Sequence, residues 1–159
     1  MTLKGFKMAP EKLDRLGTNA LLYAFTKALH RAVGGSAAAV MRQAGPDMLK
    51  ELTTLGIDGI DSTDINVIQE KVGNLFLDLG FCESISFDKT DDLLSVHVKG
   101  CSFWELTQSL KEEGIPPFAC PFAGVMVAIA EKNLGHRARI KQVVPEGDRA
   151  SLIEIQLLN

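Results

Sequence analysis

The fold is decided by PFACPFAGVMVAIAEKNLG, residues 117–135, and by RARIKQVVPEGDRASLIEIQLL, residues 137–158. The first stretch has a cysteine and a proline at the start of a predicted helix, followed by an unbroken apolar run over residues 125–130. Such a helix has to be covered on nearly every side, because apolar surface is unfavourable in water. The second stretch predicts two strands joined by a turn at residues 145–148.

Upstream of this region, the N-terminal half of the chain has apolar residues at helical spacing. Glycines punctuate the pattern, and they predict helices that end at Gly34-Gly35, Gly45-Pro46, Gly56 and Gly80. The helix before Gly80 is expected to be capped by one residue of the segment 61–63. Residues 37–44 are rich in small side chains, so they suit close packing against a neighbouring helix or a seam between two copies.

After Gly80 the apolar period changes from helical to two, and residues 81–98 predict a hairpin with its turn at residues 89–92. A further helix is expected from about residue 102 to 113, before the Pro116-Pro117 crossing. The resulting fold class is α+β: a helical N-terminal half plus a four-stranded antiparallel sheet made of two hairpins separated by two helices.

Composition limits the class of protein. The chain has 159 residues, of which 46% are hydrophobic and 23% charged, and this predicts a single domain over residues 1–159 with a flexible N-terminus over residues 1–12. The formal net charge of -3 and the scattered basic residues argue against nucleic-acid binding. No apolar run has the length of a membrane span, and three cysteines indicate reduced thiols in the cytoplasm.

Several short motifs resemble those of a known family. They are Ala-Val-Gly-Gly-Ser at residues 32–36, Cys-Pro-Phe-Ala-Gly at residues 120–124 and the Gly147-Asp148 turn. Together with the order of elements, they make residues 15–158 similar to the 4-vinyl reductase domain, also called the hydrocarbon-binding domain, which is related to the small core subunits of the TRAPP tethering complex. Ser151 stands where many members of that family have a cysteine.

The resemblance implies a small-molecule-binding module, a homodimer with an apolar cavity between helices and sheet. It assigns Cys120 and Gly124 to the family's helix start. Aromatic and apolar residues near the Pro-Pro crossing complete the expected ligand-binding set, although plain core packing explains them equally well. The full ligand-binding set is Phe103, Trp104, Phe118, Cys120, Phe122, Gly124, Met126 and Ile129.

A zinc site is the alternative role for the cysteines. His97 and Cys101 should project to the same side of one strand, and Cys120 and Cys82 could join them. A thiol at a helix N-terminus is also expected to favour its thiolate form. The spacing contains no Cys-x-x-Cys pair, so ordinary buried cysteines stay an equally open interpretation.

No constellation of catalytic residues stands out, so the sequence favours a protein that is not an enzyme. We expect a sensor or carrier of a hydrophobic or tetrapyrrole-like molecule. Two alternatives follow from the same resemblance. One is a component of a vinyl-group reductase, and the other is a TRAPP-like dimeric adaptor with a filled core.

Overall fold

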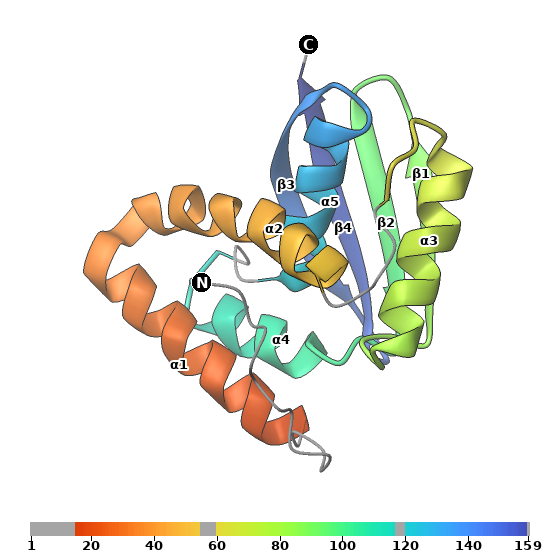
Figure 1. The fold of residues 1–159 in the computed structure, drawn as a ribbon. Coiled ribbons are helices and arrows are strands. Elements are labelled where there is room, and N and C mark those ends of the chain that lie inside the picture. The colour runs from red at the N-terminus through yellow and green to blue at the C-terminus, as the bar shows by residue number, and fades with distance from the viewer. Residues whose placement is uncertain (1–14, 55–59, 117–119, 159) are drawn as a thin grey trace.

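A computed structural model describes residues 15–54, 60–116 and 120–158 of the chain. It confirms the α+β class, with helices throughout the N-terminal half and one antiparallel sheet (Figure 1). The segment predicted to be flexible, residues 1–12, lies outside the described residues. The elements are α1 (Arg15–Val33), η1 (Gly34–Ser36), α2 (Ala37–Thr54), α3 (Ile65–Asp78), β1 (Ser84–Lys89), β2 (Leu93–Lys99), α4 (Trp104–Glu112), α5 (Pro121–Lys132), β3 (Arg137–Glu146) and β4 (Ala150–Leu158).

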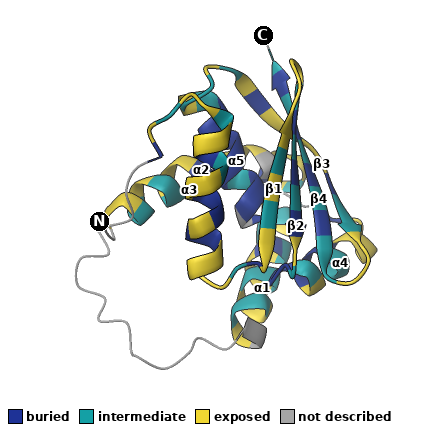
Figure 2. Cartoon of the chain, turned by 90° about the vertical axis from the view of Figure 1, so that its right-hand side faces the viewer, coloured by how far each residue is buried: buried dark blue, intermediate teal, exposed yellow. Residues whose placement is uncertain are grey.

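The four strands lie in the order β1-β2-β4-β3, so the two predicted hairpins join through β2 and β4. Val96 pairs with Ile153 across this central contact, and both side chains are buried. Along β2, buried residues alternate with half-buried ones, because only one face of the sheet is covered by helices (Figure 2). A register shift between Ile140 and Gln142 places a β-bulge in edge strand β3.

Helix α5 is the centre of the core, as its apolar sequence predicts. Every residue from 122 to 130 except Gly124 is buried, and Figure 2 shows α5 as a dark-blue element behind the sheet. α5 contacts β3, β4 and α2, while α3 contacts β1. The helix is therefore enclosed between the sheet and α2 (Figure 1). Its first turn starts with Pro121, whose missing N–H costs nothing at that position.

The prediction of two helices separated at Gly45-Pro46 is wrong, since α2 runs from Ala37 to Thr54 with Pro46 inside it. The packing of α2 against α5 outweighs the tendency of Gly45-Pro46 to end a helix. A Cβ on Gly45 would lie 2.2 Å from the carbonyl oxygen of Gly124, so the glycine is needed for the close crossing of α2 and α5. This close contact lies one residue beyond the small-residue stretch 37–44, whose own predicted role in helix packing or in a seam between two copies stays a prediction.

Helix and turn boundaries follow local chemistry. Asp64, rather than a residue of the segment 61–63, caps α3 by accepting a hydrogen bond from the Asn66 backbone N–H at 2.8 Å. Gly80 lies just beyond α3 with a φ of +67°, as its predicted role requires. The turn between β3 and β4 has Asp148 and Arg149 at φ values of 54° and 61°, which is the pattern of a type I′ turn.

Candidate functional site

Four phenylalanine rings pack together where α5 begins. The ring centroids of Phe76 and Phe122 are 4.5 Å apart at an interplanar angle of 75°, and those of Phe81 and Phe103 are 5.3 Å apart. The sequence indicated Phe103 and Phe122 but not the other two, which come from α3 and the residues just after it. Edge-to-face rings of this kind fill a core efficiently.

The other residues of the predicted ligand-binding set lie around the same core. Met126 and Ile129 are fully buried, and Gly124 faces Gly45 of α2. Trp104 is half-buried at the start of α4, and its indole N–H is buried without a hydrogen-bond partner. Phe118 lies outside the described residues. The assignment of this set to a ligand stays a prediction.

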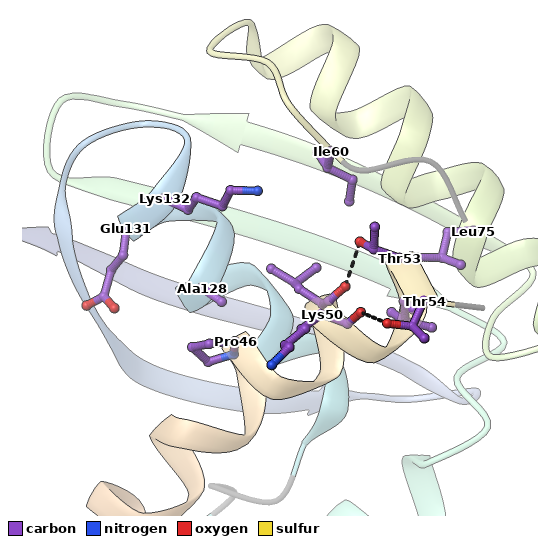
Figure 3. A pocket seen from close by; sticks show the side chains of 11 residues that line it. Pro46, Lys50, Thr53, Thr54, Ile60, Leu75, Ala128, Glu131 and Lys132 are labelled. Carbon is purple, nitrogen blue, oxygen red and sulfur yellow. Dashed lines mark hydrogen bonds between the residues drawn. The ribbon is translucent and has the colours of Figure 1, made fainter. Parts of the chain in front are cut away.

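A pocket of about 700 Å³ lies elsewhere, between α2, α3 and α5 (Figure 3). Its cationic side chains are Lys50 and Lys132, and Lys132 forms an ion pair with Asp61 at 2.9 Å. The members of the predicted ligand-binding set that the structure describes do not line it. The lining residues are Pro46, Leu49, Lys50, Leu52, Thr53, Thr54, Ile60, Leu75, Ala128, Glu131 and Lys132. The described lining residues include neither a thiol nor a histidine.

All three cysteines are buried and have free thiols. Burial raises the pKa of Cys82 to about 11 and that of Cys120 to about 12, and it also raises the pKa of Cys101. Backbone N–H groups at the start of α5 oppose this shift at Cys120, but desolvation is the larger effect. The expectation of a favoured thiolate at Cys120 is therefore wrong, and the cysteine is protonated at neutral pH.

The four residues considered for zinc do not assemble into a metal centre. His97 lies on the open face of the sheet, where its Nε2 is 3.3 Å from a carboxylate oxygen of Asp88, whereas the cysteines are buried. Within the described part of the chain, no three His, Cys, Asp or Glu side chains gather in a way that could hold a metal ion.

Helix α1 turns a polar stripe toward the rest of the molecule. The Asn19 side-chain amide donates to the backbone carbonyl of Ser102 at 2.9 Å. The Lys27 ammonium lies 2.7 Å from a carboxylate oxygen of Glu113, and the Tyr23 hydroxyl donates to the same carboxylate. Hydrogen bonds from Lys27, and then from Tyr23, lower the pKa of Glu113. These contacts attach α1 to α4 and to the segment that precedes it.

The opposite stripe of α1 is apolar and exposed. Phe25 is 65% exposed and Leu21 is 55% exposed, and the alanines at positions 20, 24 and 28 accompany them. We call these five residues the α1 apolar face. The sequence predicted a helix here from the spacing of its apolar residues, and an apolar stripe on a helix ordinarily faces inward. The polar spacing of Asn19, Tyr23 and Lys27 was the signal that could have corrected this orientation.

Comparison with known proteins gives a family. A model described as "Putative rubredoxin C-terminal domain" matches residues 18–157, which is nearly the whole chain. The chain belongs to this family. A relative named "Putative rubredoxin" from Methanothermobacter thermautotrophicus is 30% identical over 136 residues, covering 86% of this chain and 69% of the relative. An uncharacterised protein of Methanocaldococcus jannaschii is 27% identical over 140 residues, covering 87% of this chain and 85% of that protein.

This membership corrects the resemblance to the 4-vinyl reductase domain and to TRAPP subunits. It also overturns the functions drawn from that resemblance: a sensor or carrier of a hydrophobic molecule, a vinyl-reductase component and a TRAPP-like adaptor. The motifs behind the resemblance have simpler causes here. Cys120 and Pro121 start a buried helix, and Gly147-Asp148 belongs to a tight hairpin turn, so each is a local solution available to many folds. Among the described residues, no helix could cross a membrane.

Proposed function

We propose that this chain is a metal-free docking domain of a rubredoxin-type electron-transfer system, which binds and positions an iron-bearing carrier. The α1 apolar face is the observation that carries the proposal, because it is an exposed surface with an aromatic residue at its centre. The free thiols favour a reducing compartment, so we assign the domain to the cytoplasm.

The residues of the chain do not fit a rubredoxin-type iron centre. Such a centre is a single iron held by four cysteine thiolates, and thiolate is the form that binds metal. The sequence contains three cysteines, and all three are buried and protonated at neutral pH. The match also leaves nearly a third of the relative named "Putative rubredoxin" outside the aligned stretch. These facts support placing the iron on a partner domain or protein.

The chemistry of α1 indicates what its partner offers. Phe25 and Leu21 supply an apolar centre, and α1 contains basic residues such as Arg31 but no acidic residue. A complementary surface is therefore apolar in the middle and acidic at its rim. Contacts between electron-transfer partners are small and transient, so one exposed aromatic anchor with few neighbours has the appropriate size.

Calorimetric titration of the purified chain with iron-loaded rubredoxin tests the proposal. We expect Phe25→Asp to weaken binding at least about tenfold, because it introduces a charge at the centre of the contact. Leu77→Asp is the matched control, since Leu77 is 42% exposed on α3. The control should keep the wild-type dissociation constant within about twofold.

Two results would contradict the proposal. The first is stoichiometric iron in the purified chain by elemental analysis, which would make it a carrier itself. The second is a dimer in sedimentation experiments that Phe25→Asp converts to a monomer while rubredoxin binding stays unchanged. That outcome would assign the α1 apolar face to a contact between two copies of the chain.

A further inference from the structure

Two of the buried cysteines lie just beyond the end of the β1–β2 ladder, one on each of the two segments. The ladder ends at the pair Ser84 and Lys99. The backbone N–H of Glu83 donates to the Lys99 carbonyl at 2.9 Å, and that of Ser102 donates to the Phe81 carbonyl at 2.9 Å. Counted on from the last ladder pair, Cys82 is opposite Cys101, and the hydrogen bond between Ser102 and Phe81 keeps this register.

The register continues without an extra residue on either segment, although Gly100 bends the second one with a positive φ of +64°. The two hydrogen bonds hold the backbones of Cys82 and Cys101 near the separation of neighbouring strands. Opposed residues in antiparallel strands have Cα atoms about 4.5–5.5 Å apart, within the range of about 4.4–6.8 Å that a disulfide spans. The continued register therefore gives the two cysteines a backbone spacing that suits a disulfide.

Electrostatics also places these thiols close together. After burial, the next cause that raises the pKa of Cys82 is the negative charge that Cys101 carries when ionised. Cys101 affects Cys120 in the same way. Only Cys82 is tied to Cys101 by flanking backbone hydrogen bonds, whereas Cys120 sits on a separate element at the start of α5.

We propose that Cys82 and Cys101 form a reversible disulfide between these paired segments, with hydrogen peroxide as the oxidant. The Cys82 sulfur attacks one peroxide oxygen, which releases water and leaves a sulfenic acid on Cys82. The Cys101 sulfur then displaces the second oxygen as water, so two thiols and one peroxide give one disulfide and two waters. A small dithiol reductant reverses the reaction. This proposal does not depend on the docking role of α1.

The structure also sets the rate of this oxidation. Cys82 and Cys101 are 7% and 3% exposed, so peroxide reaches them only when the segments that carry them open locally. Burial keeps both thiols protonated at neutral pH, and a thiol is a poor nucleophile. We therefore expect oxidation over minutes to hours rather than the rapid response of an exposed, acidic cysteine. The rate should increase as pH rises.

The test treats the folded full chain with hydrogen peroxide, blocks the remaining thiols with iodoacetamide and maps the peptides by mass spectrometry. We expect a peptide pair linked through Cys82 and Cys101, and the loss of two of the three thiols, both reversed by dithiothreitol. The Cys120→Ser variant should give the same linked pair at a similar rate. The Cys82→Ser variant should give none.

A link between Cys101 and Cys120 in the wild-type protein would overturn the proposal. So would persistence of all three thiols under conditions in which a model cysteine peptide is fully oxidised. The wild-type map keeps the test decisive even if a serine variant folds poorly. Circular dichroism before and after oxidation verifies that the link forms in the folded state.

Discussion

At the scale of single residues, burial governs the cysteines more strongly than their position along the chain. Sequence placed Cys120 correctly at the N-cap of α5 but suggested a reactive thiolate there. The local rule failed because a helix N-terminus stabilises an anion by a modest amount, whereas complete desolvation of the sulfur costs more. Sequence supplies the helix start, but it does not supply the amount of protein that surrounds it.

The raised thiol pKa values predict a loss of stability at alkaline pH. A cysteine ionises near pH 9.0 when unfolded, whereas Cys82 and Cys120 do so at about 11 and about 12 when folded. Their contribution to the free energy of unfolding is complete below pH 9 and is lost as pH rises toward 11–12. We expect a decrease of about 1 kcal/mol per pH unit for each thiol above pH 9.5, measured by urea unfolding.

Alanine variants of the two cysteines isolate this effect from other alkaline titrations. The Cys82→Ala/Cys120→Ala double variant should show a shallower decline than the wild type between pH 9 and 11. Parallel curves for the two proteins would show that the thiols ionise equally in the folded and unfolded states.

Phe122 should be the most costly aromatic side chain to remove. It is fully buried and packs against Phe76, Phe81 and Phe103. We expect Phe122→Ala to lower the free energy of unfolding by about 3–5 kcal/mol in denaturant titrations. Phe25→Ala is the comparison, and it should change that free energy by about 0.5 kcal/mol or less, because Phe25 lies on the surface. Equal losses would mean that Phe25 is part of the packed core.

At the scale of elements, the crossing of α2 and α5 explains where the sequence prediction failed. Gly45-Pro46 is an ordinary stop signal, and the intrinsic preference of the pair favours a break. The helix continues because Gly45 lets α2 approach the backbone of α5, and the contact with a fully apolar helix outweighs the local preference. Whether the helix continues depends on α5, which lies far along the chain. The local sequence around Gly45-Pro46 therefore does not predict it.

The two glycines at this crossing should respond differently to the same substitution. Gly45→Ala places a methyl group 2.2 Å from a backbone oxygen, so we expect it to lower the free energy of unfolding by more than about 2 kcal/mol. A methyl group on Gly124 meets its nearest neighbour, the Gly45 Cα, at 3.8 Å, and Gly124→Ala should be tolerated. Chemical denaturation of both variants measures the difference.

Gly17→Ala is the control for helix propensity, since open space surrounds that position in α1. It should leave stability unchanged or raise it by up to about 1 kcal/mol. If Gly45→Ala behaved like Gly17→Ala, the close crossing of α2 and α5 would be incorrect.

At the scale of the whole molecule, helix α1 is less deeply buried than the central strands and helix α5. Strands β2 and β4 and helix α5 contain most of the fully buried side chains, whereas α1 contributes the half-buried Leu22, Tyr23 and Leu29 and polar contacts to residues on either side of α4. Sequence predicted the class, the two hairpins and the central helix, because strong periodicity and turn residues encode them. It could not predict which side of α1 faces solvent, since that depends on the polar groups that the residues around α4 offer to α1.

This difference predicts unequal local stability. In native-state hydrogen–deuterium exchange, amides of α1 should exchange at least about tenfold faster than those of β4 and α5, because the apolar side chains that α1 packs against the core are only half-buried, whereas those of β4 and α5 are fully buried. Mass spectrometry of peptic fragments resolves the segments. Uniform protection across the three elements would instead indicate one cooperative unit that includes α1.

The turn between β3 and β4 contains a residue that its backbone conformation disfavours. A type I′ turn prefers glycine at its second central position, yet Arg149 occupies it. Its carbonyl accepts the Cys101 N–H at 2.8 Å, and its guanidinium lies near Glu105. Replacing Arg149 with glycine would relieve the backbone strain of the turn. It would also remove the guanidinium that lies near Glu105 at the start of α4. A substitution chosen only for the preference of the turn would therefore remove a contact between the β3–β4 turn and α4.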